Sequence, residues 1–257
     1  MAAAADAARR YGIHSAMPLA KARRLCPHAV FLYGNHSLYA EFSDRIFALL
    51  DRYSPRMQPM SLDEAYLDLT GCARLNGPIL TVAECIRNEI KSIVGINASI
   101  GIACNKLVAK IASDYAKPSG MLWIAAGKEQ TFLAPLPVSR IPGVGQKTRE
   151  HLIRMGIKTI GHLAGFPRSL LEKVYGKYGA DLYRKARGFC NSSVSTREDP
   201  RSISREITLR NDSSDADYLI SILSYQTEEV AAQLRETGFH ARRVTLKLRY
   251  SDFKTVT

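Results

Sequence analysis

The sequence predicts an α+β protein with at least two domains, and three observations point to this class. The chain has 257 residues, which exceeds the roughly 100–200 residues of a typical domain. Residues 36–125 alternate between stretches with the apolar spacing of helices and short stretches typical of strands. Residues 127–192 instead predict short helices separated by glycines. A mixed unit is therefore followed by a small helical one.

The elements are predicted in order along the chain. Residues 1–35 are expected to be helical and basic, and they end in the turn signals Cys26-Pro27 and Gly34-Asn35. The mixed unit is expected to contain helices at 38–53, 82–94 and 105–115, a hairpin around Leu62, and strands at 97–102 and 121–125. After a linker at 193–201, we expect a strand at 202–209, a helix at 217–236 and a strand at 243–250. Alternating apolar residues of this last strand are expected to pack against the preceding helix, namely Val244, Leu246, Leu248 and Tyr250.

The composition excludes a membrane-spanning or disordered protein. Hydrophobic residues make up 46% of the chain and charged residues 23%, and no stretch reaches the roughly 18 consecutive apolar residues of a membrane helix. The alanine-rich start lacks the pattern of a signal peptide, so we expect a cytoplasmic protein that binds no membrane. Five cysteines have spacings that fit neither a disulfide framework nor a zinc site, and we expect unpaired thiols at Cys26, Cys72, Cys85, Cys104 and Cys190.

The net charge of +12 is concentrated in the middle of the chain. Residues 127–192 hold 12 basic and 4 acidic side chains, whereas residues 193–257 hold 10 of each. Such a concentration of positive charge is typical of a protein that contacts a polyanion. A solvated basic surface without a partner is the alternative, and charge alone does not decide between the two.

The segment Ser61-Leu-Asp-Glu-Ala-Tyr-Leu-Asp68 carries the sharpest chemical signal. Apolar residues on both sides of Leu62-Asp63 predict two short strands that meet at a tight turn, which would place Asp63 and Glu64 together at its tip. One or two carboxylates plus substrate phosphates are the ligands that Mg²⁺ prefers, so the tip indicates phosphoryl transfer. A polar turn with two solvated acids is the alternative.

A second signal is the helix predicted at 105–115, together with Lys117 after it. One face of this helix is expected to be apolar, while Lys106, Lys110 and Ser113 lie on another. A lysine that precedes a proline at a helix exit, as Lys117 does, could present its ammonium group to a phosphate. A surface lysine in a loop is the alternative.

A third signal is a glycine-rich turn between two predicted helices in the basic segment. Its glycines let backbone amides approach a phosphate closely, and the N-terminus of the following helix adds partial positive charge. The turn therefore predicts a helix-hairpin-helix that binds the nucleic-acid backbone without reading sequence, through Gly143, Val144, Gly145, Lys147, Thr148 and Arg149. A simple turn between helices is the alternative.

Taken in order, these motifs resemble the Y-family translesion DNA polymerases, and most closely the DNA polymerase IV (DinB-like) branch. The resemblance covers essentially the whole chain, and the motif at Ser61–Asp68 is highly specific. The other matching segments are residues 8–13, 101–110, 116–120, 141–145 and 202–209.

The resemblance implies a right-hand polymerase fold. Its parts would be partial fingers at 1–35, a palm at 36–125, a helical helix-hairpin-helix thumb at 126–192, a linker at 193–201 and an incomplete little finger at 202–257. The implied reaction is template-directed, low-fidelity DNA synthesis past damaged bases, with two Mg²⁺ ions as cofactor. The implied partners are primer-template DNA and deoxynucleoside triphosphates, and a sliding clamp would bind through a C-terminal tail that this chain lacks.

The resemblance also assigns roles to single residues. Asp63 would bridge both metal ions, and Glu64 would bind the ion on the side of the primer hydroxyl. Arg9 and Lys117 would bind the triphosphate, and the helix-hairpin-helix would hold duplex phosphates.

Family features that the sequence does not contain lead us to expect a chain truncated at both ends. The strand with the first metal-binding aspartate and half of the little finger are missing from it. We therefore expect this chain to be inactive alone. A non-catalytic DNA-binding relative or fragment is the alternative, and a metal-dependent nuclease is a weaker hypothesis because the other motifs stand in polymerase order.

Overall fold

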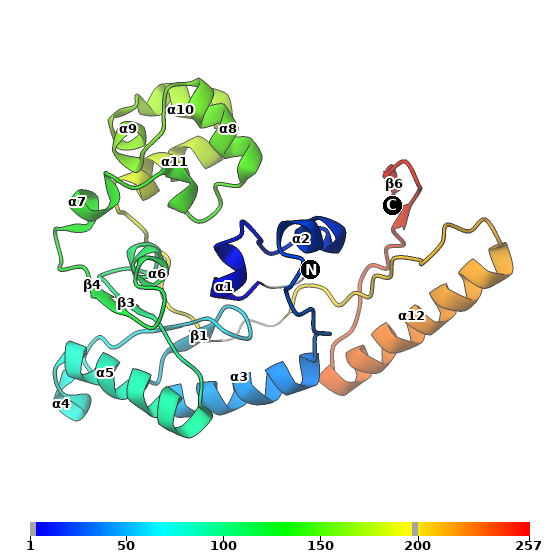
Figure 1. Cartoon of the computed structure of the whole chain (residues 1–257), viewed down its shortest axis with the longest axis horizontal. Coiled ribbons are helices and arrows are strands. Elements are labelled where there is room, and N and C mark those ends of the chain that lie inside the picture. The colour runs from blue at the N-terminus through cyan, green and yellow to red at the C-terminus, as the bar shows by residue number, and fades with distance from the viewer. Residues whose placement is uncertain (1–3, 197–199) are drawn as a thin grey trace. The chain divides into compact units, whose positions relative to one another are not determined.

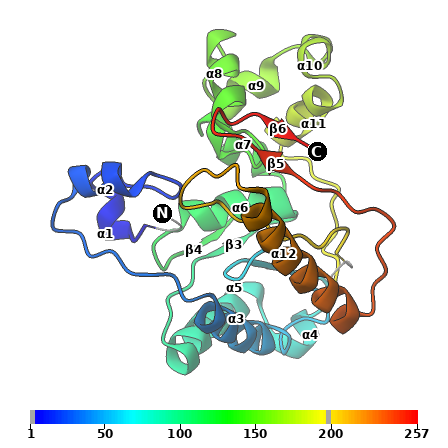
Figure 2. The ribbon, with the colours of Figure 1, turned by 90° about the vertical axis from the view of Figure 1, so that its right-hand side faces the viewer.

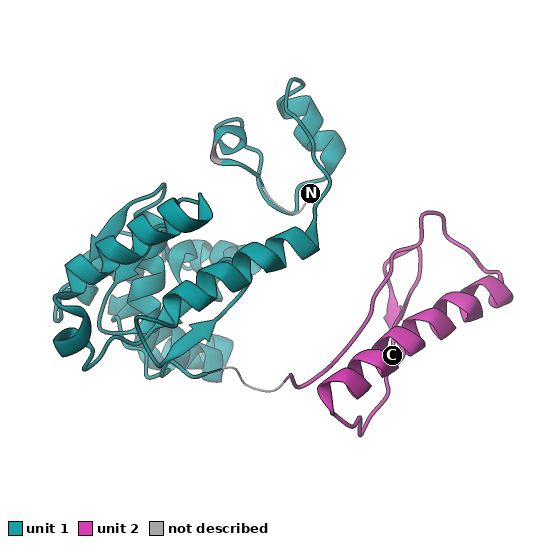
Figure 3. Ribbon diagram, turned by 90° about the horizontal axis from the view of Figure 1, so that it is seen from below, with its two compact units in different colours: residues 1–197 teal, residues 198–257 magenta. Residues whose placement is uncertain are grey.

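The chain folds into two compact units, Met1–Arg197 and Glu198–Thr257, in a computed structural model that describes residues 4–196 and 200–257 (Figure 3). The first unit holds three clusters of buried apolar side chains. None of the described residues of the second unit is buried. The mixture of helices and short strands confirms the predicted α+β class.

The smallest apolar cluster belongs to the first helices of the chain. Helix α1 spans Asp6–Arg9 and α2 spans Leu19–Leu25. Ala22 of α2 is buried together with Ile13, Met17 and Cys26, and Ala8 of α1 packs against them. The prediction of a helical segment at 1–35 is thus confirmed for these two short stretches only, since residues 26–35 form no helix.

The second cluster lies between two helices and a hairpin. Its elements are α3 (His36–Leu50), β1 (Met57–Pro59), β2 (Ala65–Leu67), α4 (Ala73–Asn76), α5 (Ile79–Glu89) and the π-helical turn η1 (Ile90–Val94) (Figure 1). Leu49 and Leu50 of α3 pack with Val82 and Ile86 of α5, and the strand residues Met57, Ala65 and Leu67 lie against them. The hairpin is antiparallel, with Met57 opposite Leu67 and Pro59 opposite Ala65, which confirms the turn predicted around Leu62.

A β–α–β unit completes this part of the chain. The parallel strands β3 (Ile100–Ile102) and β4 (Met121–Trp123) are joined by α6 (Lys106–Tyr115). The Asn105 side chain caps α6 by accepting a hydrogen bond from the Val108 amide at 3.1 Å. Helix and strands lie where the sequence predicts them, although both strands are shorter than expected.

Short helices then form a bundle (Figure 2). They are α7 (Glu129–Leu133), the 3₁₀ turn η2 (Val138–Arg140), α8 (Gln146–Arg154), α9 (Ile160–Gly165), α10 (Arg168–Tyr175) and α11 (Lys177–Ala186). Leu133, Leu152, Leu163 and Leu182 from this bundle belong to one core that also contains the buried face of α6. The prediction of short helices is confirmed, and their core reaches into the preceding mixed unit.

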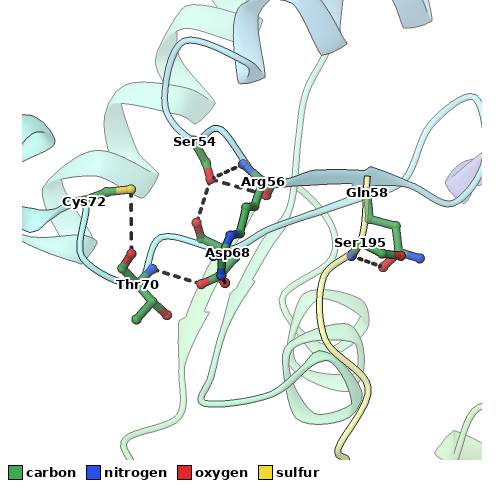
Figure 4. Close-up of polar contacts among 7 residues, drawn as sticks. All are labelled: Ser54, Arg56, Gln58, Asp68, Thr70, Cys72 and Ser195. Carbon is green, nitrogen blue, oxygen red and sulfur yellow. Dashed lines mark hydrogen bonds and ion pairs between the residues drawn. The ribbon is translucent and has the colours of Figure 1, made fainter. Parts of the chain in front are cut away.

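A polar network fixes the start of the hairpin (Figure 4). The Ser54 side chain is buried, and its hydroxyl donates to the Asp68 carbonyl at 2.6 Å while accepting from the Arg56 amide at 3.0 Å. Asp68 in turn accepts from the Thr70 amide at 3.0 Å. Ser54 therefore joins the segments on either side of the hairpin, and β1 and β2 are held in register at the end away from the tip.

The second unit differs from its prediction. Helix α12 (Ala216–Thr237) confirms the expected helix, but residues 202–209 form no strand, and of residues 243–250 only Leu248–Arg249 (β5) does so, paired with Thr255–Val256 (β6). Alternation of apolar residues makes a strand only where a neighbour completes the backbone ladder. The expected packing against α12 is also wrong, since Val244 is 92% exposed. In the part of the chain that the structure describes, no helix is long and apolar enough to cross a membrane.

Candidate active site

The two predicted catalytic acids lie at the turn between β1 and β2. The Met60 amide donates to the Glu64 carbonyl at 2.8 Å and closes the turn. The Ser61 hydroxyl donates to Oδ1 of Asp63 at 2.6 Å, which orients this exposed carboxylate. The side chain of Glu64 is half-buried. The expected pairing of both acids at a hairpin tip is therefore present.

Charges of alternating sign lead from this tip along α6. Glu64 forms an ion pair with Lys110, and Nζ of Lys110 lies 3.8 Å from Oδ2 of Asp114. Oδ1 of Asp114 accepts a hydrogen bond from Nζ of Lys117 at 2.8 Å. The turn of the hairpin is thus connected to the predicted phosphate-binding lysine through two residues of one helix.

Lys117 remains charged and accessible. The hydrogen bond to Asp114 raises the pKa of its ammonium group above the ordinary lysine value, and the nearby carboxylates of Glu64 and Asp63 add to the rise. Its side chain is 57% exposed. Lys117 can therefore offer a positive charge to an anion.

The donor set at the tip fits a divalent cation that shares its coordination with a substrate. Within the described residues no three His, Cys, Asp or Glu side chains converge as a metal site of protein ligands alone. Mg²⁺ is commonly bound by one or two carboxylates, with substrate phosphates and water filling the remaining positions. Asp63 and Glu64 are two carboxylates of the kind that such a cation binds.

Arg9 lies on a different helix from Lys110 and Asp114. It ends α1, and its Nε donates to the carbonyl of Ala4 at 3.1 Å. The contacts that connect Glu64 with Lys117 come from Lys110 and Asp114 of α6. A shared role of Arg9 and Lys117 therefore remains a prediction.

The glycine turn has the geometry of a helix-hairpin-helix. Gly143 takes a φ of 96°, a left-handed conformation that favours glycine, and Gly145 is the N-cap of α8, which has no capping side chain. Ile141 and Val144 are buried, whereas the side chains of Lys147 and Arg149 are exposed and Thr148 is half-buried. The first amides of α8 and two cations are therefore available on one exposed turn.

Two distant side chains hold this turn. The Tyr178 hydroxyl donates to the Gly143 carbonyl at 2.8 Å, and Nζ of Lys185 donates to the Pro142 carbonyl at 3.3 Å. Sequence reasoning missed both residues because they lie on α11, far along the chain. No local pattern could have shown that α11 packs beside the turn.

Asp114 was also missed, although its spacing carried a signal. It lies four residues after Lys110 and three before Lys117, and both separations place side chains on the same side of a helix. The contact from Lys110 to Glu64 could not be read in this way, because it depends on how α6 packs beside the hairpin.

Comparisons with known proteins bear on this arrangement. A profile of the impB/mucB/samB family matches residues 1–114, and the profile of its C-terminal domain matches residues 200–257. A profile of the DNA polymerase-iota thumb domain matches residues 139–189. Together these profiles cover most of the chain.

Sequence relatives are named DNA polymerase IV. The protein from Dehalococcoides mccartyi is 46% identical over 257 residues, which are 100% of this chain and 66% of that protein. The protein from Alkalilimnicola ehrlichii is 41% identical over 257 residues, which are 100% of this chain and 72% of that protein. The chain thus spans about two thirds of the length of the curated relatives it matches.

Solved structures show the same likeness. A Y-family DNA polymerase chimera has a TM-score of 0.80 at 26% identity, covering 97% of this chain and 72% of the other. DinB from Sulfolobus solfataricus has a TM-score of 0.67 at 26% identity, with the same coverage of 97% and 72%. The resemblance that the motifs indicated is confirmed, and the chain belongs to the Y-family DNA polymerases, on the DNA polymerase IV branch of the impB/mucB/samB family.

Proposed function

We propose that the protein carrying these residues synthesises DNA on a damaged template, by low-fidelity nucleotidyl transfer to a primer. The observation that carries the proposal is the acidic tip of Asp63 and Glu64, from which Lys110 and Asp114 connect Glu64 to the ammonium group of Lys117. Carboxylates repel an anion unless bound cations neutralise them. A triphosphate that binds together with Mg²⁺ meets this condition.

The proposed role of each site residue follows from its charge. Asp63 and Glu64 would hold Mg²⁺, two ions in the proposed enzyme, and bound Mg²⁺ would activate the primer 3′ hydroxyl and neutralise the triphosphate. Lys117 adds positive charge where the pyrophosphate leaves, and Arg9 is proposed to contact the same group. Lys110 holds the Glu64 carboxylate in one orientation through an ion pair. Preorganised charges of this kind stabilise a transition state without reorganisation during the reaction.

The helix-hairpin-helix is the proposed contact with primer-template DNA. Backbone amides at the start of α8 and the exposed side chains of Lys147 and Arg149 suit phosphate oxygens, and Thr148 can donate a further hydrogen bond. Gly143, Val144 and Gly145 would let the DNA backbone approach closely. A cytoplasmic location is proposed as well, and a sliding clamp is proposed as a further partner of the whole protein.

We also propose the division into fingers, palm, thumb and little finger, with the ranges that the resemblance implies. The thumb at 126–192 would be the basic helical bundle, and the palm at 36–125 would include the hairpin and the β–α–β unit. The proposed linker at 193–201 lies around the boundary between the two compact units. A DNA-binding relative without catalysis is the second candidate, since its thumb would show the same basic turn.

Primer extension by the full-length protein tests the proposal. The template would carry an abasic site one nucleotide beyond the primer, with an undamaged template beside it and EDTA as the control for metal dependence. We expect Mg²⁺-dependent incorporation on both templates. Binding of the primer-template without incorporation on either one would contradict the proposal and support the second candidate.

A further inference from the structure

We propose that Asp114 is a positioning residue of this site, whose carboxylate orients Lys117 toward the triphosphate and Lys110 toward Glu64. The inference rests on the proposed function, because it assigns Asp114 a task in nucleotide binding. It concerns a residue that does not touch the substrate and acts through two lysines.

The geometry gives Asp114 a partner on each side. Its Oδ1 accepts a hydrogen bond from Nζ of Lys117 at 2.8 Å, and its Oδ2 lies 3.8 Å from Nζ of Lys110. Lys110 reaches Glu64 with the same ammonium group. One carboxylate therefore connects the lysine proposed to bind phosphate with the acid proposed to bind metal.

The helix that carries Asp114 is firmly fixed. Leu107, Val108 and Ile111 of α6 are buried, and the Asn105 side chain caps its first turn. Asp114 and Lys110 are 33% and 25% exposed, so both side chains are partly shielded from water. A long lysine side chain loses much rotamer freedom when it is held in one place. A charge-assisted hydrogen bond to a fixed carboxylate offsets this loss of entropy.

Charge and position predict opposite effects for Asp114. A third carboxylate beside Asp63 and Glu64 repels a triphosphate, so removing its charge would strengthen nucleotide binding if charge were all that mattered. If Asp114 instead holds Lys117 in place, removing its charge releases the ammonium group and weakens nucleotide binding. The direction of the change therefore distinguishes the two roles.

The experiment compares Asp114→Asn and Asp114→Glu with the unmodified full-length protein. Single-nucleotide incorporation gives kcat and KM for the nucleotide, and nucleotide binding to a complex with a dideoxy-terminated primer gives Kd without turnover. We expect Asp114→Asn to raise KM and Kd by roughly tenfold or more, as for a lost charge-assisted hydrogen bond. Asp114→Glu should restore most of the loss, because its carboxylate can still reach both lysines.

Glu172→Gln is the matched control. Glu172 also forms an ion pair within one helix, with Arg168 at 2.7 Å, and is 39% exposed. Its substitution should leave both constants unchanged. Thermal unfolding of all variants identifies a folding defect. If Asp114→Asn has one, Asp114→Glu is compared with the unmodified protein instead.

The outcomes separate the inference from the function on which it rests. Unchanged or lower KM and Kd in Asp114→Asn would overturn the positioning role while leaving the polymerase proposal intact. No incorporation by the unmodified protein would contradict both. A rise in KM and Kd that Asp114→Glu does not reverse would also overturn the role, since it would point to general disruption of α6.

Discussion

Replacing Gly101 by alanine should separate β3 from α6. A Cβ atom built on Gly101 would lie 2.0 Å from the Ala109 carbonyl oxygen and 2.3 Å from the Ser113 amide nitrogen. Both atoms belong to the backbone of α6, so neither can rotate away as a flexible side chain would. The only relief is a movement of the helix away from the strand.

The size of the effect follows from these distances. Ordinary contact lies near 3.5 Å, so the strand and the helix must separate by roughly 1.5 Å. Overpacking of this kind costs about 1–3 kcal/mol, and contacts with backbone on one side favour the upper end of this range. For a unit of this size each kcal/mol lowers the unfolding temperature by about 2–4 °C, which gives a decrease of about 6–12 °C.

Thermal unfolding followed by circular dichroism measures this change. Gly165→Ala is the matched control, because a Cβ at Gly165 meets nothing within 4 Å. Gly165 ends α9, and alanine there should leave the unfolding temperature unchanged or raise it slightly. Because α6 also carries Lys110 and Asp114, Gly101→Ala should in addition lower nucleotide incorporation.

An unfolding temperature of Gly101→Ala within about 2 °C of the parent would refute the reasoning. A destabilisation of only 1 kcal/mol already lowers the unfolding temperature of a unit of this size by about 2–4 °C. It would mean that β3 and α6 do not approach as closely as described. A decrease of the same size in Gly165→Ala would instead show that glycine replacement is harmful in general.

Three further predictions concern the hairpin and the helix-hairpin-helix. Ser54→Ala should lower the free energy of unfolding by about 1–3 kcal/mol in a denaturant titration, because the partly buried Asp68 carbonyl and Arg56 amide lose the hydroxyl of a buried side chain. Hydrogen bonds from Thr70 hold the pKa of Asp68 below its usual range, so its stabilisation is present above about pH 3.9 and is lost as pH falls through the lower folded value. A stability curve of Asp68→Asn should therefore fall less steeply in acid. The double variant Lys147→Ala with Arg149→Ala should reduce the slope of log affinity for duplex DNA against log salt by about 2.

Local patterns predicted the parts of the fold that depend on neighbouring residues. The hairpin around Leu62 and the apolar face of α6 follow from spacing along a few residues, and both were confirmed. Of the strand expected at 243–250 only Leu248–Arg249 formed, because alternation shows only that a segment could join a sheet. Whether it does so depends on a partner strand that spacing does not reveal.

The candidate site divides in the same way. Asp63 and Glu64 were found because they are adjacent and lie in a turn, which a short motif can show. The ion pair of Lys110 with Glu64 joins residues that are 46 positions apart, and only the packing of α6 beside the hairpin creates it. The hydrogen bond from Tyr178 to Gly143 joins residues that are 35 positions apart, and the sequence could not predict it for the same reason.

The most direct test of the central claim is the rate of single-turnover incorporation by Asp63→Asn and Glu64→Gln in the full-length protein, measured with its affinity for primer-template. Asp51→Asn, which neutralises an exposed carboxylate at the end of α3, serves as the control. We expect each site variant to lose about 10²-fold or more in rate while DNA affinity and the control stay unchanged. Site variants that keep the parent's rate would contradict the claim that this hairpin tip is the catalytic centre.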